Sequence, residues 1–383
     1  MPTMRRIAAH YLISEGEVML RPVVTLSDEG FITEIAQWDH LDGMAHTEFY
    51  AGAIIPALVN AHCHLELSYL QGAIPRGCGF AGFASHLRGV REQFTAEQRL
   101  SAQLAADNKM HSEGIVAVGD IANGDESFCA KQKSQMEYHT FAEVFGYRDN
   151  LAEARGLLRH NNTTLTPHSC YSLQSEVFSE VVRSSEGEPL SIHFLESAAE
   201  KELYRGHGGL AEWYSAMGWQ WDFLSRYGSP TERLIAQIPP EQELLLVHNC
   251  YIDEEDIERL TAHFRQITFV LCPASNDYIS GVRPPVALLR RKGCRIAIGT
   301  DSLASAESLS MVDNLRLLHD VPLAEAVRWA TEGGAQALHT STAARIALSQ
   351  RHLALLEGVV QSPNGELMLS EKARCRAINN GLK

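Results

Sequence analysis

The chain repeats one unit, a short apolar run followed by a stretch with helical spacing, and this repetition limits the possible folds. Eight runs rich in β-branched residues end in polar residues, at 54–62, 114–120, 138–145, 162–168, 189–193, 243–248, 267–273 and 294–301. The stretches between them, such as residues 89–114 and 253–266, contain good helix formers at helical spacing. Strands and helices that alternate over roughly 250 residues are typical of a (β/α)₈ or TIM barrel. We therefore predict an α/β fold with a barrel from residue 54 to residue 340.

The two ends of the chain have a different pattern. Residues 1–53 read as short strands separated by turns, and the tail offers a strand, a turn around residues 363–365 and another strand. Strands from both ends can pair with each other. We expect a small composite β-sandwich domain from residues 1–53 and 341–383, beside a hydrolase barrel of residues 54–340.

Composition limits the partners and the compartment. The formal net charge of −14 gives no basic surface, so we expect neither nucleic acid nor membrane as a partner, but a small-molecule substrate. The eight cysteines contain no CxxC pair, which favours reduced thiols. No run approaches about 18 apolar residues, and the first residues lack the pattern of a leader. A cytoplasmic location follows, and a homodimer is left open.

The sequence "NAHCHLE" places His62 and His64 at the end of the first apolar run. Residues i and i+2 of a strand point to the same side, so both imidazoles would face one site. With 17 histidines in the chain, an isolated HxH is more often surface or core. A barrel, however, carries its reactive groups where strands end, and three more residues fall there: His193, His248 and Asp301. Three or four such ligands predict a catalytic metal site.

Five motifs in this order resemble those of the amidohydrolase superfamily, in its branch of hydrolytic deaminases and atrazine or triazine chlorohydrolases. They are "NAHCHLELS", "IHFLES", "LVHN", "CPASN" and "GTDSLAS". The resemblance covers nearly the whole chain, because members of that branch also build a small β-domain from both termini. Within the branch, the first motif and the segment after it are most similar to the aminodeoxyfutalosine deaminases.

The resemblance implies the role of each motif residue. It makes four residues the metal ligands: His62, His64, His193 and Asp301. It also makes Glu196 the proton shuttle and His248 a contact of the water or the substrate, while Asp301 accepts a proton from water. From the residues alone, Glu196 could instead be a first-turn acid of the next helix.

The metal content can also be inferred. Members with two metals hold a bridging carboxylated lysine at the end of strand 4, but "NTTLTPHSCYS" contains no lysine, and neither does "HTFAEVFGY" on strand 3. We therefore expect one divalent metal, zinc first and iron as the alternative. Such a metal lowers the pKa of water to about 7.

The substrate is inferred from the resemblance. It implies hydrolysis of the exocyclic amino group of an adenine-type nucleoside such as aminodeoxyfutalosine, with Glu66, His168 and Tyr171 in contact with the substrate. From the residues alone, Glu66 could instead orient a ligand histidine, and His168 could be satisfied within its loop. The tryptophan-rich segment 210–227 could form an aromatic lid or pack a helix on the barrel.

The sequence departs from the family's pattern at two places, and two alternative functions remain open. Relatives often have asparagine where this chain has Ala306, and the tail lacks the usual closing segment, which bears on the small domain and the substrate. An amidohydrolase or chlorohydrolase that cleaves a C–N or C–Cl bond of another small molecule is the second hypothesis. A non-catalytic binding protein on the same barrel is the third, because fold does not fix function.

Overall fold

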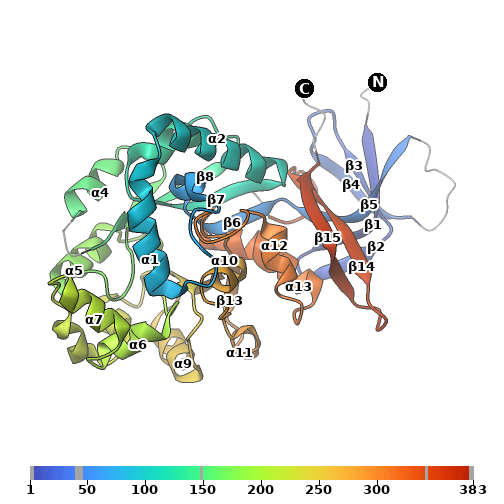
Figure 1. The fold of residues 1–383 in the computed structure, drawn as a ribbon. Coiled ribbons are helices and arrows are strands. Elements are labelled where there is room, and N and C mark those ends of the chain that lie inside the picture. The colour runs from blue at the N-terminus through green and yellow to red at the C-terminus, as the bar shows by residue number, and fades with distance from the viewer. Residues whose placement is uncertain (1–3, 39–45, 147–149, 341–343, 379–383) are drawn as a thin grey trace.

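The computed structural model describes residues 4–38, 46–146, 150–340 and 344–378. It has two parts that lie side by side, a barrel surrounded by helices and a sheet that contains both ends of the chain (Figure 1). The predicted α/β barrel with a small β-domain from both termini is confirmed. The boundaries at residues 53/54 and 340/341 stay a prediction, and residues 341–343 lie outside the described residues.

Eight parallel strands form the barrel, in two four-stranded groups. Isolated bridges join the groups, between Cys63 and Asp301 on one side and between Ser169 and His193 on the other. The strands are β6 (Leu58–Cys63), β7 (Ile115–Ala122), β8 (Glu137–Val144), β9 (Thr163–Pro167), β10 (Leu190–Phe194), β11 (Leu244–His248), β12 (Ile267–Leu271) and β13 (Arg295–Ile298). Each observed strand overlaps one of the predicted runs.

The first predicted run needs a correction, because residues 54–62 belong to two strands. The first, β5 (Thr47–Pro56), pairs within the terminal sheet, and β6 begins two residues later in the barrel. Proline ends the first strand, since it lacks the N–H that a ladder needs. The chain therefore passes from the sheet into the barrel without a linker.

Helices follow most strands and cover the outside of the barrel (Figure 1). They are α1 (Gly79–Val90), α2 (Ala96–Ser112), α3 (Phe128–Lys131), α4 (Leu151–Leu157), α5 (Ser175–Ser184), α6 (Ala198–Tyr204), α7 (Gly209–Ala216), α8 (Pro230–Gln237), α9 (Glu254–His263), α10 (Pro273–Ile279), α11 (Val286–Arg291), α12 (Met311–Arg316), α13 (Leu323–Arg328) and α14 (Gly334–Ala337). The expected helical stretch 89–114 is broken before α2, because Thr95 and Gln98 form a capping box there.

Strands from both ends of the chain form one sheet of seven strands, in the order β15–β14–β5–β1–β3–β4, with β2 paired to β1. The remaining members are β1 (Arg5–Ser14), β2 (Glu17–Leu20), β3 (Pro22–Leu26), β4 (Ile32–Gln37), β14 (Leu353–Gln361) and β15 (Leu367–Ala377). Strand β14 pairs antiparallel with β5, which joins the C-terminal hairpin to the N-terminal strands. The sheet is thus built across the whole length of the chain.

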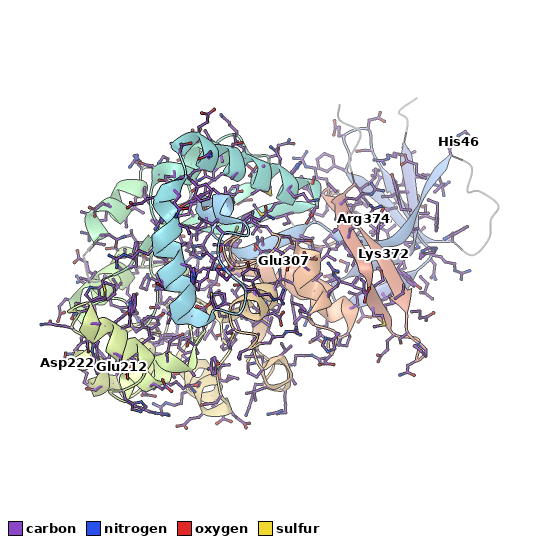
Figure 2. The ribbon with its side chains drawn as sticks, viewed as in Figure 1. His46, Glu212, Asp222, Glu307, Lys372 and Arg374 are labelled. Atoms are coloured by element: carbon purple, nitrogen blue, oxygen red, sulfur yellow. The ribbon has the colours of Figure 1, made fainter. Side chains whose placement is uncertain are left out.

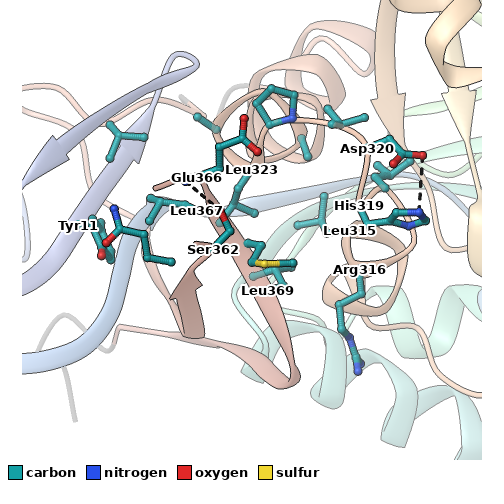
Figure 3. Close-up of a pocket in the computed structure, with 18 of the residues that line it drawn as sticks. Tyr11, Leu315, Arg316, His319, Asp320, Leu323, Ser362, Glu366, Leu367 and Leu369 are labelled. Atoms are coloured by element: carbon teal, nitrogen blue, oxygen red, sulfur yellow. Dashed lines mark hydrogen bonds and ion pairs between the residues drawn. The ribbon is translucent and has the colours of Figure 1, made fainter. Parts of the chain in front are cut away.

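A groove of about 710 Å³ lies where the β14–β15 hairpin meets the segment from α12 to α13 (Figure 3). Its lining is largely apolar, with Leu315, Leu323 and Leu367 among its residues, and His319 and Asp320 form an ion pair at its edge, 3.5 Å apart. No residue of this groove lines the pocket at the strand ends described below. The groove therefore marks the seam between the sheet and the barrel helices.

Charged side chains project from the surface, among them Glu212 on α7, Glu307 after β13 and Lys372 and Arg374 on β15 (Figure 2). Within the described ranges, no helix combines the length and the apolar composition needed to cross a membrane.

Gly119 on β7 lies where a side chain would not fit. A Cβ there would be 2.6 Å from the carbonyl oxygen of Ala61 on β6 and 2.7 Å from Cδ2 of Leu338. Gly119→Ala should therefore lower the free energy of unfolding by about 1 to 3 kcal/mol, the usual cost of overpacking. Urea denaturation measures this, with Gly124→Ala as the control, because a Cβ at Gly124 meets nothing within 4 Å. Equal stability of both variants would contradict the close approach.

Candidate functional site

Five residues from four strand ends meet at one edge of the barrel. One side-chain nitrogen or oxygen of each of His62, His193, His248 and Asp301 lies within 4.8 Å of the others. His64 joins this group, because its Nε2 lies 3.3 Å from Nε2 of His193 and 3.4 Å from Oδ1 of Asp301. All five residues that the sequence placed at strand ends as candidates for a metal site therefore lie together in this group.

The histidines of this group are buried, and for three of them burial favours the neutral form. Burial lowers the pKa of His64 to about 3 and that of His248 to about 4, and it lowers the pKa of His193 well below its usual value. Both ring nitrogens of His62 are buried without a hydrogen-bond partner among the described residues. Neutral imidazole is the form that binds metals, and an unpartnered buried nitrogen needs a ligand. The donor set fits a divalent metal.

Asp301 supplies the negative charge of the site. Its Oδ2 accepts hydrogen bonds from the hydroxyl groups of Ser275 and Ser305, each at 2.6 Å. Its Oδ1 faces the imidazoles, 3.7 Å from Nε2 of His62 and 3.4 Å from Nε2 of His64. Burial alone would raise the pKa of Asp301, but these histidines together hold it well below its usual range. The carboxylate is therefore ionised and oriented.

The tautomer of His248 depends on a side chain of α10, the helix that follows the neighbouring strand β12. The side-chain amide of Asn276, on α10 after β12, lies 3.0 Å from Nδ1 of His248. With this amide as the donor, Nδ1 accepts and Nε2 carries the proton. Nε2 faces the Glu196 carboxylate at 3.8 Å from Oε1. His248 can therefore donate a hydrogen bond toward Glu196 or toward a molecule between them.

Glu196 follows β10 in a loop whose backbone is hydrogen-bonded to the side chain of Glu200. The carboxylate of Glu200 accepts three backbone N–H groups, from Leu195 at 3.0 Å, Glu196 at 2.7 Å and Ser197 at 3.2 Å. Glu200 thus completes the capping box of α6 with the N-cap residue Ser197, which leaves the Glu196 side chain free to face the site. Burial raises the pKa of Glu196 well above its usual value, and the charges of Asp301 and Glu200 act in the same direction.

A pocket of about 300 Å³ opens at this edge of the barrel. Every predicted site residue except His62 lines it, and His62 lies fully buried behind the other ligands. Aromatic side chains from α1 and from the tryptophan-rich segment form much of the remaining wall: Phe80, Phe83, Trp213, Tyr214 and Trp219. That segment therefore contributes directly to the pocket, in addition to packing on the barrel.

The three predicted substrate contacts all line the pocket. Glu66 accepts the backbone N–H of Asn123 through Oε2 at 2.9 Å, and no hydrogen bond joins it to a ligand histidine among the described residues. The ring of His168 stacks on that of His193 with centroids 4.7 Å apart, and its carbonyl oxygen lies 3.0 Å from Nδ1 of His193. Tyr171 lies beside it, with ring centroids 6.4 Å apart.

The sequence did not single out Asp120, which ends the second predicted run. Its Oδ1 accepts the N–H of Leu65 at 2.7 Å, directly after His64, and its carboxylate forms a buried ion pair with Lys131. It therefore fixes the backbone that follows the two ligand histidines. The rule that found His62 and His64, a polar residue at the end of an apolar run, could also have found Asp120.

Glu143, Asn276 and Arg91 were also missed. Glu143 lies next to the last residue of β8 and lines the pocket, so its position at a strand end was a usable signal. Asn276 belongs to the motif "CPASN", but its partner His248 lies on another strand. Arg91 lines the pocket from the segment after α1, where nothing in the sequence separates it from Arg88.

Comparisons with known proteins agree with this geometry. A family model described as "Amidohydrolase family" matches residues 53–347. An adenosine deaminase from Helicobacter pylori is 26% identical over 344 residues, covering 84% of this chain and 82% of that protein. A 5-methylthioadenosine/S-adenosylhomocysteine deaminase from Pelotomaculum thermopropionicum is 33% identical over 310 residues, covering 74% and 67%.

Among solved structures, a Helicobacter pylori aminofutalosine deaminase in complex with methylthio-coformycin superposes with a TM-score of 0.79 at 22% identity, over 98% of this chain and 99% of that one. This likeness supports the barrel with its terminal sheet. The resemblance indicated by the five motifs is thereby confirmed, and with it the expectation of a hydrolase of C–N bonds. The chain belongs to the amidohydrolase family.

Proposed function

We propose that this protein is a metal-dependent deaminase that hydrolyses the exocyclic amino group of an adenine-type nucleoside, with aminodeoxyfutalosine as the first candidate. One observation carries the proposal: a set of candidate metal ligands meets a largely buried glutamate, Glu196, in one aromatic pocket. A flat heterocycle fits aromatic walls, and a protonated carboxyl group suits an amidine that must be protonated. The names of the related proteins, deaminases of adenosine derivatives, support the same class of substrate.

Four residues are the proposed metal ligands: His62, His64, His193 and Asp301. The nitrogens of His64 and His193 are closest to each other, and Oδ1 of Asp301 is directed at them. His193 donates from Nδ1 to the carbonyl oxygen of His168, which leaves Nε2 as its metal-binding atom. His248 is not assigned as a ligand, because with the Asn276 amide as the donor its proton lies on Nε2.

A single metal is the second part of the proposal. No lysine lines the pocket among the described residues, so the site lacks a candidate for a bridging carboxylated lysine. Three imidazoles and one carboxylate suit zinc, with iron as the alternative. When bound, such a metal lowers the pKa of water toward neutrality.

The protein's own groups carry the protons. Asp301 is ionised and accepts the proton that the attacking water loses. Glu196 holds a proton because burial favours its neutral form, so it can protonate the ring nitrogen. It then takes a proton from the hydroxyl group that water has added and passes this proton to the amino group, which leaves as ammonia. Asp301 finally returns the proton it took from water to Glu196, which restores both carboxyl groups. His248 donates from Nε2 to orient the groups that react beside Glu196. These three residues are the proposed catalytic residues.

Glu66, His168 and Tyr171 are the proposed contacts of the substrate. They line the pocket on the same side as the ends of β6 and β9, while the aromatic residues of α1 and α7 close it. Because Glu66 bonds Asn123 and no ligand histidine, its second carboxylate oxygen is available to a substrate.

We further propose that the protein acts in the cytoplasm. All eight cysteines are free, and five of them are buried. Reduced thiols persist in a reducing compartment, which supports this location. A homodimer stays a prediction.

The first prediction concerns the metal. The purified protein should hold about one equivalent of zinc or iron, and His193→Ala should lose most of it, because a ligand is removed. Elemental analysis measures this, with His319→Ala as the control, since His319 is exposed and lies in the groove beside the terminal sheet. Two tightly bound metals per chain, or full occupancy in His193→Ala, would contradict the ligand assignment.

The second prediction separates binding from chemistry. Glu196→Gln should keep the metal and the fold, yet kcat should fall by about 10² to 10⁴ because the proton shuttle is lost. Ammonia release and metal content are the two measurements, and Glu212→Gln, an exposed site on α7, is the control. Near-normal turnover would move the shuttle to another residue, with His248 the next candidate.

The third prediction tests the substrate. A panel of amino-heterocycles should release ammonia most efficiently from adenine-type nucleosides, aminodeoxyfutalosine foremost, and less from cytosine, guanine or triazine compounds. Buried polar groups that pair with one ring reject others by factors of about 10⁴ or more. Activity on a simple amide or a chlorotriazine, with no ammonia from any aminopurine, would sink the deaminase proposal and leave the metal site standing.

A further inference from the structure

A buried carboxylate at the end of β8 has no task in the mechanism above. Glu143 is 3% exposed and lines the pocket, and its Oε1 has no hydrogen-bond partner among the described residues. Nδ1 of His193 lies 3.6 Å away, but that N–H already points to the carbonyl oxygen of His168 at 3.0 Å. Supporting a ligand histidine therefore does not explain Glu143. Burial of such a group is costly unless something pairs with it.

A second metal does not explain it either. One atom each of Glu143, His168 and His193 lies within 4.8 Å of the others, which could suggest a metal site. The atom of His193 nearest to Glu143 is Nδ1, which is committed to the His168 carbonyl group, while Nε2 faces His64. This leaves only two candidate ligands, too few for a metal site.

Two further atoms in the same pocket share the property of Glu143. Glu66 is also 3% exposed, and its Oε1 makes no hydrogen bond within the described part of the chain, although it forms a long ion pair with Nη2 of Arg91 at 3.9 Å. Nδ1 of His168 is buried and likewise makes none. The pocket thus presents unpartnered polar atoms on residues from the ends of three barrel strands.

The chemistry of these atoms selects the partner. A carboxyl oxygen that carries no proton accepts hydrogen bonds, so the free oxygen of Glu143 suits a partner that donates. An imidazole with Nδ1 protonated needs an acceptor beside it. A hydroxyl group does both, whereas an ammonium group only donates. Phe80 and Trp213 line the pocket with aromatic rings, which suit a flat ring of the substrate.

We propose that Glu143 is a specificity-determining residue that accepts a hydrogen bond from a hydroxyl group on the substituent of the heterocycle, with Glu66 and His168 completing this polar side of the pocket. The substrate is then a nucleoside with sugar hydroxyls and not a free base. This inference rests on the proposed deaminase function, which it refines by giving the sugar its own binding residue.

The experiment compares adenosine with 2′,3′-dideoxyadenosine, which lacks two hydroxyl groups, in the metal-loaded protein. In Glu143→Gln, kcat/KM for adenosine should fall about 10- to 100-fold, mainly through KM, as expected when a buried hydrogen bond is lost. The value for the dideoxy compound should stay within about twofold, and metal content should equal that of the unaltered protein. Glu153→Gln, an exposed site on α4, is the control and should change neither value.

The outcomes separate the two proposals. Equal losses for both nucleosides, or no loss for either, would overturn the role of Glu143 while deamination stands. Ammonia from adenine as readily as from adenosine would overturn it as well. If no compound releases ammonia, the deaminase proposal fails. The role of Glu143 is then tested separately, by measuring the affinity for the two nucleosides by calorimetry. Two proteins are compared by calorimetry, the variant Glu196→Gln and the double variant that also carries Glu143→Gln. Their affinities should differ for adenosine but not for 2′,3′-dideoxyadenosine. Equal affinities for adenosine would overturn the assignment.

Discussion

The junction between the first and last barrel strands is the constraint on which the site depends. The carbonyl oxygen of His62 accepts the N–H of Thr300 at 2.9 Å and that of Asp301 at 3.0 Å, and the carbonyl oxygen of Asp301 accepts the N–H of His64 at 3.3 Å. The side chain of Asn60 exchanges two hydrogen bonds with Thr300 beneath them. The contacts that close the barrel are therefore the ones that join ligands from its two ends. A fault in closure would separate His62 and His64 from Asp301.

Burial gives the groups of this site different protonation states. Imidazoles lose their charge when buried, so His64 and His193 stay neutral and can coordinate. Asp301 keeps its charge because two hydroxyl groups and the histidines stabilise the anion. For Glu196, burial raises the pKa well above its usual value, and no hydroxyl group among the described residues donates to its carboxylate, so it holds a proton more strongly. One environment thus provides a base and an acid within the same pocket.

The sequence alone predicted those site residues that lie at the ends of barrel strands. His62, His64 and Asp301 could be found because a parallel strand must deliver its last residues to one edge of the barrel. Asn276 could not be assigned to His248 in the same way, because the two meet across neighbouring strands. Nor could the run 54–62 reveal that it serves two sheets, since a continuous apolar run gives no sign of a change of partner.

The place of Glu143 near the end of β8 was a usable signal, but the direction of its side chain could not be predicted. The run "HTFAEV" is buried on both faces of the strand, so no alternation tells which side chains face the pocket. The aromatic wall is a third case, because α1 and the tryptophan-rich segment reach the pocket from loops whose course depends on tertiary packing. The sequence therefore located the metal site more completely than the surface that selects the substrate.

Backbone strain is concentrated where the chemistry is. Leu195, His248, Asn249 and Asp301 all have positive φ, at 49°, 78°, 60° and 59°. Residues other than glycine adopt this region at a cost of order 1 to 3 kcal/mol each, which surrounding contacts must offset. Those contacts are present: the Asn249 amide donates to the carbonyl oxygen of Leu246 at 2.7 Å, and Leu195 donates to Glu200. The strain turns the chain sharply at the end of each strand. Because Leu195 and Asn249 are held by hydrogen bonds within the protein, this part of the site can be preorganised before any metal or substrate binds.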